Sequence, residues 1–229
     1  MHPDVDPLLA DVQADIASNN PGPNYAKAYR GSERNYWRHI PGWIAELPSN
    51  IRVLDVGAAY GTLAIFTKRL LNADVVCVDA IPYFAPQSLL EREEIPLILK
   101  NVELSDFHDL GTFDLIIFTE IIEHLNFHPH ATLQKLKSLL RDGGKIALST
   151  PNAGSRWGRV TKYHSALSDL PAAPAPGRKW IDDHIWQYTE DELRQVLTEA
   201  ELVIEKFAVS PGKDNATHFN VLCGLPAAR

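Results

Sequence analysis

The chain has 229 residues, of which 45% are hydrophobic, and a formal net charge of −7. This length and apolar content suffice for the core of one α/β domain, and the negative charge disfavours a broad grip on nucleic acid, which needs clustered Lys and Arg. We expect no secretory signal at the acidic, proline-containing N-terminus, and no membrane span, because no apolar run is long enough. Two cysteines without metal-ligand spacing indicate buried thiols in a reducing, cytoplasmic compartment.

The predicted elements alternate between strands and helices. A helical N-terminal segment, broken near residues 19–23, precedes a helix that ends before Pro48 and covers residues 35–47. Apolar runs predict one strand from residue 51 and further strands at residues 74–79, 97–102, 113–119 and 145–150. The helices expected between them cover residues 62–71, 86–92 and 129–140, and a turn is expected at residues 142–144.

A late helix begins at Thr189, where Glu192 three residues on completes a predicted capping box. Two last strands, at residues 202–209 and 218–223, would close the sheet. Strands separated by helices imply parallel pairing through right-handed crossovers. The pattern therefore predicts a doubly wound α/β fold.

The first strand runs into a turn of small residues. Residues 53–64 read VLDVGAAYGTLA, and the turn consists of Gly57, Ala58, Ala59 and Gly61. Small side chains let a ligand approach the backbone, and the unsatisfied amides of the following helix favour a carboxylate or phosphate. The negative charge of Asp55 beneath the turn indicates that the ligand also carries an amine.

A second acid, Asp79, lies about 20 residues on, at the end of the next apolar strand, where a carboxylate accepts the hydroxyl protons of a nucleoside ribose. The dinucleotide pattern G-x-G-x-x-G would fall on Gly57, Ala59 and Thr62, so two of its three glycines are absent. The turn and the two acids therefore predict a nucleoside ligand other than a nicotinamide dinucleotide.

These motifs resemble those of class I S-adenosylmethionine-dependent methyltransferases, over residues 35–224 and in the same order. The first motif of that family, an acid followed by G-x-G-x-G, is similar to Asp55, Gly57, Ala59 and Gly61, with alanine at the middle glycine. FDLIIFTEIIEHL resembles the fourth motif, and LLRDGGKIALSTPN resembles the stretch through the fifth strand. The resemblance implies a Rossmann-like, seven-stranded, mostly parallel sheet with one antiparallel strand and helices on both faces.

The resemblance also implies that S-adenosylmethionine is the cofactor. The family holds the adenine ring at the end of the third strand. The implied cofactor-binding residues are Asp55, Gly57, Ala58, Ala59, Gly61, Asp79, Ala80, Asn101, Val102, Glu103, Thr119 and Glu120. Asn101 and Glu103 are equally consistent with a solvated strand end, although α/β sheets place ligands at strand carboxyl ends.

Glu120, Glu123 and His124 predict a polar cluster after the fourth strand. If EIIEHL opens a helix, these residues at i, i+3 and i+4 share one face, with Ile121, Ile122 and Leu125 toward the core. Two carboxylates and an imidazole in a cleft are costly unless a positive charge lies among them, which favours a divalent cation. A fourth ligand is available in DDHIWQYT, so the predicted metal site is Glu120, Glu123, His124 and His184.

The pairing of E-x-x-E-H with a later D-H-x-x-x-[WY]-T resembles two metal-using branches of the family. One methylates the 2′-hydroxyl at the 3′ ends of small RNAs, and the other methylates catechols in quinone biosynthesis. In similar members that need no metal, the histidine is a base or lines the pocket, so His124 and His184 are also the candidate catalytic bases. His128 and His130 are expected in an exposed loop.

Two segments lie outside the common core of the methyltransferase domain, which is expected at residues 49–229. Residues 1–48 are expected to form a helical cap, and residues 151–180 a substrate insert. The insert has five basic residues and one acid, a local net charge of +4, which fits either a solvated loop or an anionic acceptor. Aromatic residues in both segments fit either the core or a cover over the cleft: Tyr25, Tyr29, Tyr36, Trp37, Trp43, Trp157, Tyr163 and Trp180.

The favoured interpretation is a cytoplasmic O-methyltransferase whose acceptor is a small molecule with vicinal hydroxyls, such as a sugar derivative or a catechol. One alternative is 2′-O-methylation of an RNA 3′ end. The other is a binding protein that keeps the fold without turnover.

Overall fold

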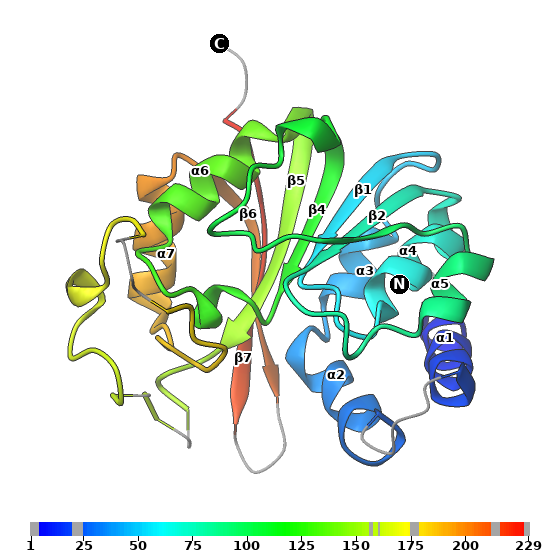
Figure 1. Cartoon of the computed structure of the whole chain (residues 1–229), viewed down its shortest axis with the longest axis horizontal. Helices are drawn as coiled ribbons and strands as arrows, with labels where there is room; N and C mark the ends of the chain where they lie inside the picture. The colour runs from blue at the N-terminus through cyan, green and yellow to red at the C-terminus, as the bar shows by residue number, and fades with distance from the viewer. Residues whose placement is uncertain are drawn as a thin grey trace.

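The computed structural model describes residues 5–19, 25–155, 158–159, 161–174, 179–211 and 216–226. A seven-stranded sheet in the order β3-β2-β1-β4-β5-β7-β6 forms its centre (Figure 1). The strands are β1 (Arg52–Val56), β2 (Asp74–Asp79), β3 (Leu97–Leu99), β4 (Phe113–Thr119), β5 (Leu140–Pro151), β6 (Val203–Pro211) and β7 (Thr217–Gly224). Only β7 runs antiparallel to its neighbours, which confirms the expected fold class.

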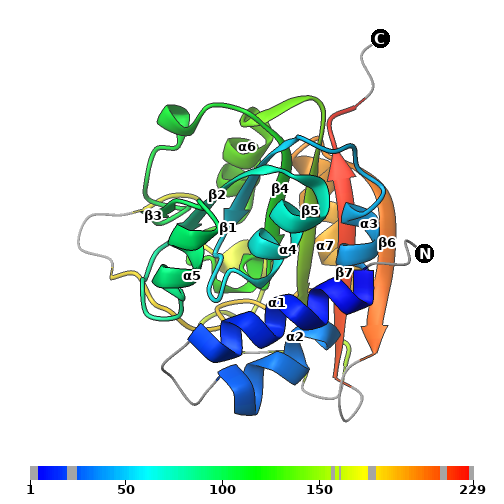
Figure 2. The same cartoon turned by 90° about the vertical axis from the view of Figure 1, so that its right-hand side faces the viewer.

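Helices cover both faces of this sheet (Figure 2). One face carries α1 (Val5–Asn19), α3 (Ile40–Ile44), α4 (Thr62–Leu71) and α5 (Gln87–Arg92). The other face carries α6 (His130–Ser138) and α7 (Glu190–Glu199). The remaining helical segments are α2 (Arg30–Tyr36) and the single turns Tyr25–Tyr29, His108–Leu110, Ile122–His124 and Leu167–Asp169. None of the helices in the described ranges has the length and apolar character needed to cross a membrane.

The central strands are buried on both faces because successive side chains enter two different cores. In β1, Leu54 and Val56 pack with α6 and α7, whereas Val53 packs with α1 and α4. In β4, Ile116 belongs to the core on the α6 and α7 side, and Leu115 belongs to the core on the α1 and α4 side. Such strands read as continuous apolar runs in the sequence, which is why their positions were predictable.

The single helix predicted at residues 35–47 is wrong. The structure has two helices there, with a break at residues 37–39 between α2 and α3. Pro41 lies in the first turn of α3, where its missing N–H costs nothing; inside a continuous helix its ring would clash with the carbonyl of Trp37. The break exposes two backbone groups to the Asn220 side chain on β7, which accepts from His39 N at 2.9 Å and donates to Tyr36 O at 2.8 Å.

Two predicted strand boundaries also differ from the structure. β3 ends at Leu99 rather than residue 102, because Asn101 Oδ1 accepts hydrogen bonds from Glu103 N and Leu104 N and closes a turn. β5 begins at Leu140, ahead of the predicted start at residue 145. The predicted turn at residues 142–144 lies in a register shift of this strand, between the Phe113–Leu140 and Leu115–Lys145 pairs.

The order of the strands determines where a ligand binds. β1 lies between β2 and β4, so the chain leaves β1 toward one side of the sheet and leaves β4 toward the other. The loops after these two strands diverge and leave a crevice at their carboxyl ends.

Substituting Thr189 by Ala is expected to lower the free energy of unfolding by about 1 kcal/mol, because the cap of α7 is lost. Thr189 Oγ1 accepts from Glu192 N at 3.3 Å, and Glu192 Oε2 accepts from Thr189 N at 2.9 Å, which confirms the predicted capping box. Urea unfolding measures the change. Thr198→Ala, in the exposed last turn of the same helix, is the control and should change it by less than about 0.5 kcal/mol; equal losses would contradict a capping role.

Candidate active site

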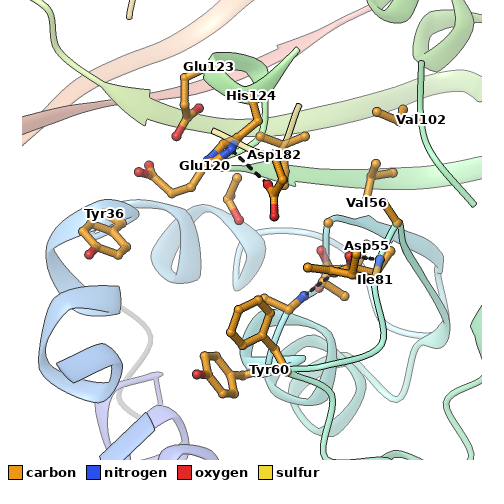
Figure 3. Close-up of a pocket in the computed structure, with 18 of the residues that line it drawn as sticks. Tyr36, Asp55, Val56, Tyr60, Ile81, Val102, Glu120, Glu123, His124 and Asp182 are labelled. Atoms are coloured by element: carbon orange, nitrogen blue, oxygen red, sulfur yellow. Dashed lines mark hydrogen bonds and ion pairs between the residues drawn. The ribbon is translucent and has the colours of Figure 1, made fainter. Parts of the chain in front are cut away.

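A pocket of about 310 Å³ lies at the carboxyl ends of β1, β2, β4 and β5 (Figure 3). The N-terminal segment closes one side of it through Tyr29, Glu33, Tyr36 and Trp37, and the segment before α7 closes another through Trp180, Asp182 and His184. Every predicted cofactor, catalytic and metal residue except Gly61 is among its lining residues. The pocket therefore collects side chains that are far apart in the sequence.

The small-residue turn after β1 adopts a left-handed backbone at Gly57 (φ +74°), Ala59 (φ +44°) and Gly61 (φ +70°). A side chain at Gly57 would overlap the Ile121 side chain, and Gly61 precedes the first residue of α4. The turn is closed by hydrogen bonds from Gly61 N to Ala58 O at 2.7 Å and from Gly57 N to Val78 O at 2.8 Å. The first residues of α4, Thr62 and Leu63, thus lie at the wall of the pocket.

Asp79 fixes this turn from the neighbouring strand. Its carboxylate accepts from Ala59 N at 2.9 Å and from Ile81 N at 3.0 Å, and burial raises its pKa. Asp55 is buried beside it, and burial together with the negative charge of Asp79 raises the pKa of Asp55 to about 7. A positively charged ligand in the pocket would stabilise both carboxylates in their ionised form.

The predicted adenine site lies at the turn after β3. Asn101, Val102 and Glu103 all line the pocket. The Glu103 carboxylate accepts from Asn126 N at 3.0 Å and from Phe127 N at 2.9 Å, and Asn101 Oδ1 closes its own turn. Both side chains therefore shape the wall of the pocket with hydrogen bonds inside the protein.

The α-helix predicted to begin with EIIEHL is wrong. Glu120 has a left-handed backbone (φ +55°), and only a single 3₁₀ turn, Ile122–His124, follows. Glu120 thereby turns away from the direction of Glu123: its carboxylate accepts from Ser149 Oγ at 2.7 Å and lies 2.9 Å from His218 Nδ1.

Three of the four predicted metal ligands do come together. Glu123, His124 and His184 each offer a ligand atom, and these atoms lie within 4.8 Å of one another. Glu123 is fully buried; its Oε2 accepts from Thr150 Oγ1 at 2.9 Å, and its Oε1 has no partner among the described residues. The fourth predicted ligand, Glu120, is paired with Ser149 and His218 instead.

The pKa values of Glu123, His124 and His184 are shifted mainly by burial. Burial and the charge of Glu120 raise the pKa of Glu123 well above its usual range. Burial and the neighbouring His184 lower the pKa of His124 to about 4, and burial lowers the pKa of His184. The His124 ring meets the His184 ring edge-on, with centroids 4.7 Å apart, and its Nδ1 lies 3.6 Å from Asp182. Both imidazoles are therefore neutral at neutral pH.

Several pocket residues were not predicted. The His218 ring packs at a tilt against the Tyr36 ring, with ring centroids 4.7 Å apart. Because β7 is antiparallel, its first residues lie beside the carboxyl end of β5. The resemblance implied one antiparallel strand, and assigning it to residues 218–223 could have found His218. Glu33 is buried, and its carboxylate accepts from Thr62 Oγ1 at 2.7 Å and from Tyr25 Oη at 3.0 Å, which ties the N-terminal segment to the start of α4.

The insert is only partly described. Arg156, Trp157, Arg178 and residues 175–176 lie outside the described residues. Of its other basic residues, Arg159 pairs with Glu192 at 2.6 Å and Lys162 pairs with Asp183 at 2.8 Å. These two cations are therefore engaged within the protein, and the described part of the insert supports the solvated-loop interpretation of its charge.

A doubly wound sheet with an antiparallel seventh strand, and a pocket at the point where the strand order reverses, is the architecture of class I S-adenosylmethionine-dependent methyltransferases. The family model described as a methyltransferase domain matches residues 29–206, and the chain belongs to that family.

Curated relatives match a shorter region. A ubiquinone biosynthesis O-methyltransferase from Xanthomonas axonopodis pv. citri is 34% identical over 109 residues, which are 46% of this chain. The chain spans 45% of the length of that relative.

Solved structures with the same fold cover nearly the whole chain. A Burkholderia thailandensis 1,6-didemethyltoxoflavin-N1-methyltransferase, with bound 1,6-didemethyltoxoflavin and S-adenosylhomocysteine, covers 93% of this chain and 87% of its own (TM-score 0.62, 20% identity). The N-terminal domain of EvdMO1, in the presence of SAH and D-fucose, covers 96% and 97% (TM-score 0.59, 18% identity). At these identities the similarity concerns the fold.

In the metal-free protein, the His124 imidazole should titrate near pH 4, as measured by NMR of its ring protons. The unfolded imidazole takes up a proton below pH 6.5 and the folded one does not, so stability should fall as the pH drops from 6.5 to about 4. His124→Asn should show a smaller loss of unfolding free energy over this window. A His124 titration midpoint near 6.5 would contradict the buried, neutral ring.

Proposed function

We propose that the protein transfers a methyl group from S-adenosylmethionine to an oxygen atom of a small molecule with vicinal oxygens. The observation that carries this proposal is the position of the Glu123–His124–His184 group in the same pocket as the small-residue turn and Asp79. A nucleoside cofactor and an acceptor oxygen would thus meet in one cavity.

In this proposal the cofactor spans the ends of β1, β2 and β3. Asp79 binds the ribose hydroxyls, the turn at residues 57–61 accommodates the methionine part, and the turn at residues 101–103 flanks the adenine. Ala58, Ala80, Thr119 and Glu120 line the same region. The carboxylates of Asp55 and Asp79 complement the positive charge of a sulfonium and an amine.

The reaction is an in-line displacement: the acceptor oxygen forms a bond to the methyl carbon, the carbon–sulfur bond breaks, and neutral S-adenosylhomocysteine leaves. The protein therefore has two tasks. It aligns oxygen, methyl and sulfur, which contributes up to about 7 to 11 kcal/mol, and it removes the proton of the acceptor hydroxyl. Aromatic side chains of the proposed cap, residues 1–48, and of the insert line the pocket, which supports exclusion of water as the role of both segments: Tyr29, Tyr36, Trp37 and Trp180.

The donor set fits a divalent metal ion. Glu123 Oε1 is buried without a hydrogen-bond partner among the described residues, and two neutral imidazoles lie beside it. One carboxylate with two imidazoles suits a transition metal, with Glu120 as a fourth ligand if its side chain leaves Ser149 and His218. A bound metal would lower the pKa of a coordinated hydroxyl, as it does for water.

The same residues also support metal-free base catalysis. His124 and His184 are neutral at neutral pH, so either imidazole is ready to accept the acceptor proton. Asp182, 3.6 Å from His124 Nδ1, would stabilise the imidazolium that forms. A chelator distinguishes the two routes.

The acceptor class rests on the relatives. The Xanthomonas relative is named an O-methyltransferase of ubiquinone biosynthesis, which supports a catechol, and the EvdMO1 domain was solved with D-fucose, which supports a sugar. The motif resemblance also allows an RNA 3′ end as the acceptor. The net charge of −7 disfavours it, because affinity for RNA depends on cationic contacts. We place the reaction in the cytoplasm on the strength of the two free, buried cysteines.

Purified protein with labelled S-adenosylmethionine is expected to methylate catechol, and His184→Ala should lower the rate about 10²- to 10⁴-fold. The exposed His130 supplies the control, His130→Ala, which should keep the wild-type rate. Loss of activity with a chelator, restored by a divalent metal, would select the metal route. If neither catechol, nor a sugar diol, nor a cell extract receives label, the methyltransferase proposal fails.

Asp79→Ala should weaken S-adenosylhomocysteine binding about 10- to 100-fold, because charge-assisted hydrogen bonds to the ribose and to the Ala59 amide are lost together. Isothermal titration calorimetry measures this affinity. Asp74→Ala, an exposed acid at the other end of β2 that pairs with Arg52, is the matched control and should leave it unchanged. Equal affinities in the two variants would contradict the cofactor position.

A further inference from the structure

Asn126, just after the 3₁₀ turn, makes an unusual set of hydrogen bonds for a side chain. It is 2% exposed. Its Nδ2 donates to Ile181 O at 2.9 Å, and its Oδ1 accepts from Ile181 N at 2.9 Å. Nδ2 also donates to His124 O at 3.1 Å. Because a side-chain amide carries the same donor and acceptor as a peptide, Asn126 pairs with the Ile181 backbone as a neighbouring strand would.

A second contact holds the other end of the same loop, residues 181–186. Ile185 N at 2.7 Å and Trp186 N at 3.1 Å both donate to Glu123 O. The loop is therefore attached at both ends to residues 123–126. Asp182 and His184 lie between these attachments, and both approach His124, Asp182 at 3.6 Å and the His184 ring at 4.7 Å between centroids.

Asn126 is itself held from the opposite side. Its backbone N donates to Glu103 Oε2, so the carboxylate in the wall of the predicted adenine site also fixes this residue. Lys135 donates to Val102 O at 2.6 Å and to Ser105 O at 2.7 Å and secures that turn in place. Asn126 thus joins a rigid support to the 181–186 loop.

We propose that Asn126 is a positioning residue, whose side chain sets the place of His184 and Asp182 against His124. The catalytic part of this inference rests on the proposed function, whereas the positioning part does not. In the described structure the Ile181 backbone makes no hydrogen bonds other than those to Asn126. Without them the loop keeps its backbone bonds to Glu123 and the bonds of its Asp183 side chain to Lys162 and Tyr163. The backbone on the N-terminal side of Asp182 and His184 is then no longer held against residues 123–126.

Two variants test this role. Asn126→Ala removes all three side-chain hydrogen bonds. Asn126→Asp has nearly the same shape, keeps the acceptor for Ile181 N and loses the two hydrogen bonds that Nδ2 donates. If the alanine variant does not fold, the aspartate variant still tests the proposal. Gln134→Ala is the control, because Gln134 Nε2 donates to Ala200 O at 3.1 Å and joins α6 to α7 away from the pocket.

Hydrogen–deuterium exchange measures how well the amides of the 181–186 loop are protected. In Asn126→Ala the amides of residues 181–186 should exchange about 10- to 100-fold faster, with a smaller increase in Asn126→Asp and none in Gln134→Ala. The kcat for catechol should fall about 10²-fold, since a misplacement of 1 Å can cost that much, while S-adenosylhomocysteine affinity stays within about twofold. This separation distinguishes positioning of the loop from general loss of structure.

Unchanged exchange in the loop, or a fall in cofactor affinity as large as the fall in kcat, would overturn the proposal. If the wild-type protein methylates no acceptor, the proposed function fails, and the exchange measurement still decides whether Asn126 holds the loop.

Discussion

The constraint on which the site depends is the burial of the central parallel strands on both faces. With two helical layers against it, a strand such as β4 buries every side chain from Leu115 to Phe118, and its partly exposed residues, Asp114 and Thr119, lie near its ends. Polar chemistry is therefore concentrated at the strand ends, where the reversal of strand order at β1 opens a crevice. Asp55, Asp79 and the residues after β4 meet in it because the fold leaves them no other accessible place.

That crowding gives the pocket an unusual charge balance. Asp55, Asp79 and Glu123 all have raised pKa values, because burial penalises their ionised forms and too little positive charge compensates. The imidazoles of His124 and His184 respond in the opposite sense and remain neutral. The positive charge of S-adenosylmethionine would complement the carboxylates of Asp55 and Asp79, and the proposed metal, or a proton, would complement Glu123.

The sequence predicted the features that depend on local chemistry. The apolar runs of β1, β2 and β4, the small-residue turn and the Thr189 cap each follow from a few neighbouring residues. The left-handed Glu120 was beyond such reasoning, since its conformation is stabilised by Ser149 and His218 from other strands. His218 itself reaches the pocket only through the antiparallel register of β7, which involves residues far away in the chain.

The contacts of Asn220 have a consequence for the order of assembly. This β7 side chain makes two hydrogen bonds to the backbone between α2 and α3. One is to His39, 181 residues away in the sequence, and the other is to Tyr36, 184 residues away. During synthesis the segment between α2 and α3 is made well before Asn220, so it gains this partner only after all the intervening strands have been made. Ligand-binding competence should therefore mature late in biogenesis, after the β1–β4 scaffold is already in place.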